Sequence, residues 1–190
     1  RVDGATGGYI YMDAGMGLLT SGVYSAYGNV GAGGMIDITG SDLRFFSATL
    51  NAAGQSMGGM VRLGGAFQGG KTVDPNADYF DSFIGRWSAL PTLSSSQKNM
   101  INDSTQIDVQ AHAGAGGKAI IWSDDETTFL GQIDARGQTG AGSVEISSAN
   151  DLRKASLVNV TLGEGGHLLL DPKNIIIGDS ATVQSWSYAG

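Results

Sequence analysis

One pattern of glycine and apolar residues returns about every 25 positions, and it constrains the fold more than any other feature of the chain. Each repeat begins at a glycine, and apolar residues follow two and four positions later. The six glycines are Gly8, Gly34, Gly59, Gly117, Gly142 and Gly166. A fixed period of about 20 to 50 residues is typical of stacked repeats, in which a single unit cannot bury its apolar face alone. Neighbouring repeats are therefore expected to supply one another's core.

Within each repeat, apolar residues alternate with polar ones such as Asp37, Arg62 and Glu145, which is the period of two of a β-strand. The repeat at Gly117 divides into short apolar segments at 119–122, 127–130 and 133–135. Equivalent strands of successive units would stack in parallel at about 4.8 Å. The sequence thus predicts an all-β fold, a parallel β-helix or β-solenoid with three strands per coil. The aromatic residues expected in its core are Phe45, Phe46 and Phe129.

A long insertion interrupts the repeat. The interval from Gly59 to Gly117 is 58 residues, about 32 more than the period requires, and we place this excess at 71–104. The chain then consists of coils over 1–177, the insertion, and a terminal strand or tail at 178–190. We expect the insertion to fold as a flap against the outside of the coils, with a helical turn near 94–100. Its aromatic residues form either a contact surface or a satellite core, and the second is favoured because exposed aromatic clusters promote aggregation. These residues are Tyr79, Phe80, Phe83 and Trp87.

Composition excludes several classes of partner and chemistry. The chain has no cysteine, so disulfides, metal thiolates and a thiol nucleophile are ruled out. A net charge of -7 with 11 basic residues and no basic cluster makes nucleic acid and anionic membranes poor partners. No apolar run approaches the length of about 18 residues that a transmembrane helix needs. No initiating methionine or leader precedes Arg1, so we expect the chain to be a piece of a longer protein.

Two sets of residues have the chemistry of metal ligands. His112 and His167 lie beside glycine turns with no second ligand at suitable spacing, which favours solvated turn histidines. Asp124, Asp125 and Glu126 form an acidic corner that could hold calcium, because hard cations take several oxygen ligands. The calcium-binding nonapeptide of solenoids is absent, so a solvated turn is favoured. We predict no metal site and no cofactor.

An enzyme acting on polysaccharides is the main catalytic alternative. It would need two carboxylates about 5 to 9 Å apart, or a metal with a base, on adjacent coils. Asp37 and Arg62 occupy the same position in consecutive repeats, which predicts a cross-strand ion pair instead. Asn51, Asp134 and Asn159 share another repeat position and provide no pair of acids. We therefore predict no catalytic residue. Ice binding is excluded because no position holds threonine in every repeat.

Several runs of the sequence resemble filamentous haemagglutinin-like exoproteins. They are GGKAIIWSDDETTFLGQIDARGQTGAG at 116–142, SVEISSANDL directly after it, GGHLLLDPKNIII at 165–177, and GGAFQGG at 64–70 followed by PNA at 75–77. Two features depart from the family pattern. The insertion after Ala77 is longer, and Arg153 and Lys154 stand where an apolar or small polar pair is usual.

The resemblance implies a right-handed parallel β-helix in a large secreted adhesin of a Gram-negative bacterium. Such a protein is exported by two-partner secretion, through an outer-membrane transporter, and the resemblance implies no enzyme activity and no cofactor. The expected function is a shaft that presents binding surfaces to a host or neighbouring cell, whose ligand is a protein or a glycan. Because neither end of the repeat carries a polar cap, a fibre of copies stacked end to end is the alternative.

Overall fold

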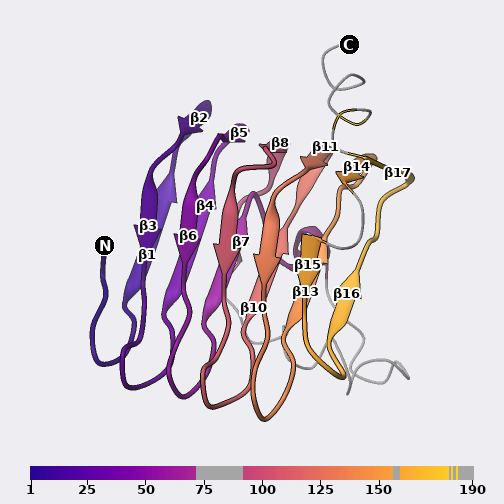
Figure 1. The fold of residues 1–190 in the computed structure, drawn as a ribbon. Coiled ribbons are helices and arrows are strands. Elements are labelled where there is room, and N and C mark those ends of the chain that lie inside the picture. Colours follow the sequence, from indigo (N-terminus) through magenta and orange to yellow (C-terminus); the bar gives the residue numbers. More distant parts are fainter. Residues whose placement is uncertain (72–91, 156–158, 180, 182, 184–190) are drawn as a thin grey trace.

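The computed structural model describes residues 1–71, 92–155, 159–179, 181 and 183. These residues form a β-solenoid in which three parallel sheets run the length of the molecule. Figure 1 shows the coils side by side, from the N-terminal coil (indigo) to β16 and β17 (yellow). The predicted fold class, with three strands per coil and a period of about 25 residues, is confirmed. The handedness of the coil stays a prediction.

Each sheet takes its strands from successive coils. The first sheet contains β1 (Tyr9–Asp13), β4 (Met35–Thr39), β7 (Met60–Leu63), β10 (Lys118–Ile121), β13 (Ser143–Ile146) and β16 (His167–Leu169). The second sheet contains β2 (Gly17–Thr20), β5 (Asp42–Phe45), β8 (Ser96–Ile101), β11 (Ser123–Phe129), β14 (Asp151–Ala155) and β17 (Asn174–Gly178). The third sheet contains β3 (Val23–Ser25), β6 (Thr49–Asn51), β9 (Gln106–Asp108), β12 (Gln132–Asp134) and β15 (Val160–Thr161).

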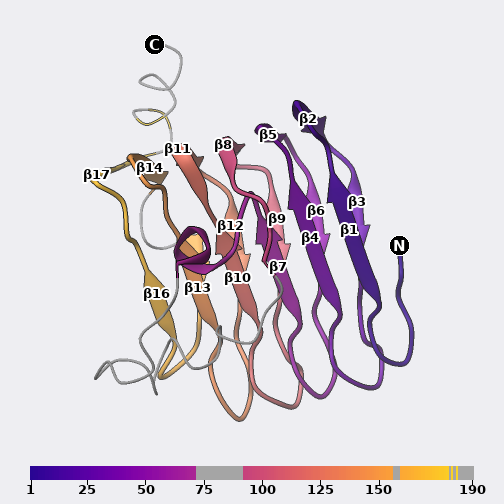
Figure 2. The same ribbon diagram turned by 180° about the vertical axis from the view of Figure 1, so that it is seen from behind.

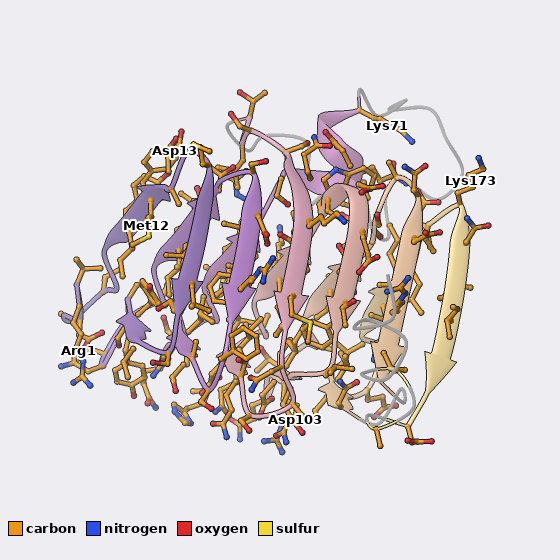
Figure 3. The ribbon with its side chains drawn as sticks, turned by 90° about the horizontal axis from the view of Figure 1, so that it is seen from above. Arg1, Met12, Asp13, Lys71, Asp103 and Lys173 are labelled. Atoms are coloured by element: carbon orange, nitrogen blue, oxygen red, sulfur yellow. The ribbon has the colours of Figure 1, made fainter. Side chains whose placement is uncertain are left out.

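The core lies between the three sheets and is built from stacked identical positions. In the first sheet Ile36, Val61, Ala119 and Val144 pair in register on consecutive strands, and each is 0% exposed. Burying such a side chain stabilises the fold by roughly 1.5 to 3 kcal/mol for the larger residues. Figure 3 shows side chains filling the space between the sheets, with Lys71 and Asp103 on opposite sides of the coils.

Two of the three aromatic residues predicted for the core lie inside it, on strands of the second sheet. Phe45 and Phe129 are 0% exposed, with Ile101 between them in the same stack. Phe46 is only half-buried, so its assignment to the core is wrong. It follows the last inward residue of β5, so the alternation of the strand turns it outward, and Ser47 after it has a φ of 57°.

The repeated glycines are required where the third strand of one coil turns into the first strand of the next. A Cβ built at Gly33 would lie 1.9 Å from the carbonyl oxygen of Ala52, which belongs to the neighbouring coil. The backbone N–H of Gly33 donates to Met57 and that of Gly34 to Ala26, so the backbone cannot move away without losing these bonds. The glycine register therefore follows from steric exclusion at this corner.

The insertion leaves the solenoid after β7 and returns at β8. It starts earlier than the expected residue 71, because the short 3-10 turn η1 (Phe67–Gly70) already lies outside the three sheets. The helical turn expected near 94–100 is wrong, because β8 is a strand between β5 and β11. Consequently 96–101 belongs to the coil and the insertion ends earlier than 104. The polar sequence of β8 was misleading because Ser96 and Asn99 point inward, where both donate to the Trp122 carbonyl.

The chain after β17 folds back onto the second sheet at one described point. Val183 is 0% exposed and packs with Leu130 and the half-buried Met100. Within the described residues, no helix is both long and apolar enough to span a lipid bilayer.

Candidate functional site

Asp37 and Arg62, the strongest charged pair predicted from sequence, form a buried ion pair on the outward side of the first sheet. They are direct partners on β4 and β7, and the guanidinium donates to both carboxylate oxygens at 2.7 and 2.6 Å. Their side chains are 0% and 1% exposed. Tyr9 adds a third donor, at 2.9 Å from the carboxylate. Burial, and then the bond to Asp37, raise the pKa of the Tyr9 hydroxyl. The predicted cross-strand pair is confirmed, and its carboxylate is bound by Arg62 and Tyr9.

The start of the insertion is fastened over the same sheet, as Figure 2 shows for the short purple coil against β13. The backbone N–H of Gln68 donates to both oxygens of Glu145 at 3.2 and 3.1 Å, and its side-chain amide donates to Asp171 at 3.0 Å. Phe67 is 6% exposed. A Cβ at Gly69, whose φ is 67°, would lie 2.6 Å from the Trp122 indole. We call Phe67–Gly70 with Glu145 and Asp171 the clasp. The expectation that the insertion at 71–104 folds as a flap against the coils stays a prediction, because 72–91 lie outside the described residues.

Glu145 is the acid most perturbed by its surroundings. It is 0% exposed, and burial raises its pKa to about 8, although hydrogen bonds from Gln68 and Ser147 act in the opposite direction. At neutral pH its side chain is therefore mostly protonated. A protonated carboxyl that is closed in by Gln68 could act as a general acid only towards a substrate that displaced the clasp.

Lys154 is a buried cation inside the solenoid. It pairs with Phe129 on β11 and Ile177 on β17, and it is 0% exposed. Its ammonium lies 5.7 Å from the centre of the Phe129 ring and donates to Asn159 at 2.5 Å. Burial lowers its pKa to about 8. Arg153 points outward to Glu126 at 3.2 Å. The unusual Arg153 and Lys154 pair is thus accommodated without loss of the strand.

The register of the fifth coil corrects one sequence assignment. Asp134 pairs with Thr161, whereas the repeat assigned Asn159 to its position. The fifth coil holds two more residues between its first and third strands than the fourth, since Val144 and Val160 correspond to Ala119 and Ile133. Asn159 instead lies at the corner before β15, where it binds Lys154 and donates to the carbonyls of Leu130 and Gly131.

The last residue of β6, β9 and β12 in the third sheet is an Asn or Asp whose side chain caps the turn that follows. Asn51, Asp108 and Asp134 each accept the backbone N–H two residues later, at 2.9, 3.0 and 3.1 Å. Such local bonds are the usual role of Asn and Asp in turns. Arg136 also binds Asp134 at 2.5 Å. Burial tends to raise the pKa of Asp134, but the Arg136 hydrogen bonds hold it below its ordinary value.

A polar groove lies on the outward side of the third sheet, and sequence reasoning did not find it. Its volume is about 460 Å³. The lining residues are Gln106, Ile107, Asp108, Gln132, Ile133, Asp134, Asn159 and Thr161. The signal was present in the sequence, because the tripeptide Gln-Ile-Asp occurs at both 106–108 and 132–134.

The acidic residues Asp124, Asp125 and Glu126, which were expected to form a turn, lie in β11 and interact with other side chains of the same chain. Asp124 accepts from the Trp122 indole at 3.0 Å, and Asp125 lies 3.9 Å from the Lys98 ammonium. In the part of the chain that the structure describes, no group of three or more His, Asp or Glu side chains is placed to hold a metal ion. The aromatic residues for which a contact surface or a satellite core is expected, Tyr79, Phe80, Phe83 and Trp87, lie outside the described residues.

No protein-family model and no curated protein matches the chain. Among solved structures, the chain is similar to the crystal structure of the HMW1 secretion domain from Haemophilus influenzae. The two share 24% sequence identity and superpose with a TM-score of 0.59, over 90% of this chain and 39% of the other. The chain thus spans less than half the length of that structure. The likeness establishes the fold: this chain is a parallel β-solenoid of the architecture found in that secretion domain.

Proposed function

We propose that this chain is a structural segment of a large secreted surface adhesin of a Gram-negative bacterium, and that it forms part of a β-helical shaft exported through an outer-membrane transporter. The observation that carries the proposal is the likeness to the HMW1 secretion domain over 90% of the chain. The resemblance of 116–142 and 165–177 to filamentous haemagglutinin-like exoproteins supports it independently.

The topology suits export as an extended chain. Every sheet is built in chain order, so each new strand pairs with the equivalent strand of the coil just completed. In such repeats, folding can nucleate locally and propagate from one unit to the next. A chain that emerges N-terminus first from a pore could therefore fold coil by coil, and each finished coil would hinder its return.

The charged residues that would suggest catalysis have structural roles. Asp37 is bound by Arg62 and Tyr9, Glu145 is closed in by Gln68, and Lys154 lies inside the core. These occupied positions support a shaft without catalytic activity over a polysaccharide-degrading enzyme.

The clasp supports a role for the insertion in presenting a surface. It fixes the start of the insertion to two later coils, through Glu145 and Asp171. The other end returns at Ser96, whose backbone N–H donates to Gly64 at 2.8 Å. Both ends are therefore held to the shaft, which suits a segment that presents a surface to a host or neighbouring cell.

Export can be tested in the bacterium that encodes the chain. The intact gene, carrying an epitope tag, would be expressed in strains that each lack one outer-membrane transporter gene, and the protein would be quantified on the surface and in the medium. We expect export to disappear in one strain and to remain in the others. Retention of the protein in the cytoplasm of the parent strain, or unchanged export in every strain, would contradict the proposal.

A fibre of copies stacked end to end is the alternative. Ile175, Ile176 and Ile177 of β17 are 44%, 39% and 47% exposed at the open edge of the second sheet. Unpaired edges of this kind can add another strand. Sedimentation of the purified chain over a concentration series distinguishes the two proposals: growing particles support the fibre, and a monomer at all concentrations rejects it.

A further inference from the structure

The groove on the third sheet is formed by two rows of outward side chains. Gln106 and Gln132 are direct partners in one row, and Asp108 and Asp134 in the other, which Thr161 extends. Neighbours within a row are about 4.8 Å apart, and the rows are separated by two residues along the strand, or about 6.6 Å. The middle residues Ile107 and Ile133 form the floor and are each 2% exposed, with their side chains in the core.

The carboxylates of the groove are held in fixed positions by the turns that follow them. Both oxygens of Asp108 accept from Gln110, at 3.0 Å each. Both oxygens of Asp134 accept from Arg136. Asp108 keeps lone pairs beyond these bonds, since an ionised carboxylate has about four acceptor sites, whereas Asp134 accepts four bonds from Arg136. The acceptors are thus oriented before any ligand arrives, which reduces the entropy lost on binding.

The glutamines are not required by the fold. Asn51 in the second coil caps its turn as Asp108 and Asp134 do, yet the residue two positions before it is Thr49. Turn capping therefore explains the acids and leaves the glutamines unexplained. Gln106 and Gln132 are exposed, and within the described residues their side-chain amides form no hydrogen bond to the protein. Each amide offers two donors and one acceptor to a ligand.

The chemistry of the groove selects among classes of ligand. The side chains that line it are polar apart from the two floor residues, which disfavours a lipid or an apolar peptide. β9 and β12 are paired on both sides, so no strand can be added to them. The two carboxylates disfavour phosphate and other anions. A ligand rich in hydroxyl groups suits the site, because hydroxyls donate to carboxylates and accept from amides.

We propose that this groove binds a neutral oligosaccharide that lies along the shaft axis, with Gln106 and Gln132 contacting successive sugar units and Asp108 accepting a hydroxyl. The groove volume of about 460 Å³ lies within the range of small-ligand sites. This inference rests on the proposed adhesive function and assigns a ligand class to one face of the shaft.

The test uses a double variant that leaves the turn caps intact, Gln106→Ala with Gln132→Ala. Gln97→Ala is the matched control, because Gln97 is also an exposed strand glutamine and lies on β8 of the second sheet. Saturation-transfer NMR would be recorded with neutral cello-, malto-, chito- and galacto-oligosaccharides at millimolar concentration. We expect saturable binding of at least one series, weakened at least about tenfold in the double variant, which corresponds to about 1.4 kcal/mol, and unchanged in Gln97→Ala.

The absence of binding by all four series, or equal binding by the wild type and the double variant, would overturn the proposal. Thermal melting of each variant checks that the shaft is folded. The export experiment is repeated with the double variant, and we expect normal export. Loss of oligosaccharide binding together with normal export would show that the groove is not needed for secretion. The oligosaccharide proposal and the export proposal can therefore fail independently.

Discussion

The buried pair of Asp37 and Arg62 gives the strongest quantitative prediction. In the variant Arg62→Met, a long apolar side chain replaces the guanidinium. The carboxylate of Asp37, 0% exposed in the wild type, then keeps Tyr9 as its only donor among the described residues. Removing one member of a buried ion pair costs about 3 to 5 kcal/mol, because the remaining charge is neither solvated nor paired. For a chain of this size each kcal/mol lowers the melting temperature by about 2 to 4 °C, so the expected decrease is about 6 to 20 °C.

The double variant Asp37→Leu with Arg62→Met shows whether the pair itself stabilises the fold. Replacing both members of a buried pair with apolar residues is often neutral or stabilising. We therefore expect the double variant to recover most of the stability that Arg62→Met loses. Urea unfolding followed by circular dichroism measures all the variants under one set of conditions.

The exposed pair of Asp42 and Arg44 is the control. Its side chains are 35% and 56% exposed, and its closest N to O distance is 2.7 Å, nearly that of the buried pair. Arg44→Met should cost less than about 1 kcal/mol, because exposed pairs contribute little. If Arg62→Met costs no more than Arg44→Met, the burial of the pair is wrong.

Three further predictions concern single residues. Burial raises the pKa of Glu145 in the folded protein to about 8, above its ordinary 4.5. The stability that this group contributes is therefore complete below about pH 4.5 and is lost as the pH rises through 8. The melting temperature of the wild type should decrease between these pH values, and Glu145→Gln should largely remove that decrease. Lys154 has a folded pKa of about 8, below its ordinary 10.5, so the wild type should gain stability between these pH values, and Lys154→Met should lack that gain in the same assay. Gly33→Ala should destabilise the fold by several kcal/mol or prevent folding, because its Cβ would lie 1.9 Å from a carbonyl oxygen. Gly140→Ala is the control and should change the urea midpoint little, because its Cβ would lie 3.5 Å from the nearest atom.

The sequence predicts the coil because the constraints that form it are local and repeated. A glycine is needed wherever two backbones meet at the corner, as at Gly33, and inward positions such as Ile36 and Val61 must stack on their equivalents. Both constraints recur at the same period, so they can be read without any knowledge of distant contacts. The ion pair of Asp37 and Arg62 could be predicted for the same reason.

The parts that the sequence did not predict depend on contacts between distant segments. Alternation places Glu145 on the outside of its strand, and nothing near it in the sequence shows that Gln68 covers it. The polar stretch at 94–100 suggested a helical turn, but Asn99 points inward because its side-chain amide donates to the Trp122 carbonyl. In the fifth coil, Asn159 binds Lys154 at the corner before β15, a contact that the repeat pattern does not show.

The most direct test of the account measures the stacking of the coils along the shaft. Leu19 on β2 and Ile176 on β17 occupy the same outward position of the second sheet, five strand spacings apart. The chain contains no cysteine, so spin labels can be attached at Leu19→Cys and Ile176→Cys alone. Five spacings correspond to about 24 Å between the backbones. Pulsed electron paramagnetic resonance should give one narrow distribution between about 20 and 30 Å; a broad distribution, or a distance well beyond this range, would contradict the in-register solenoid.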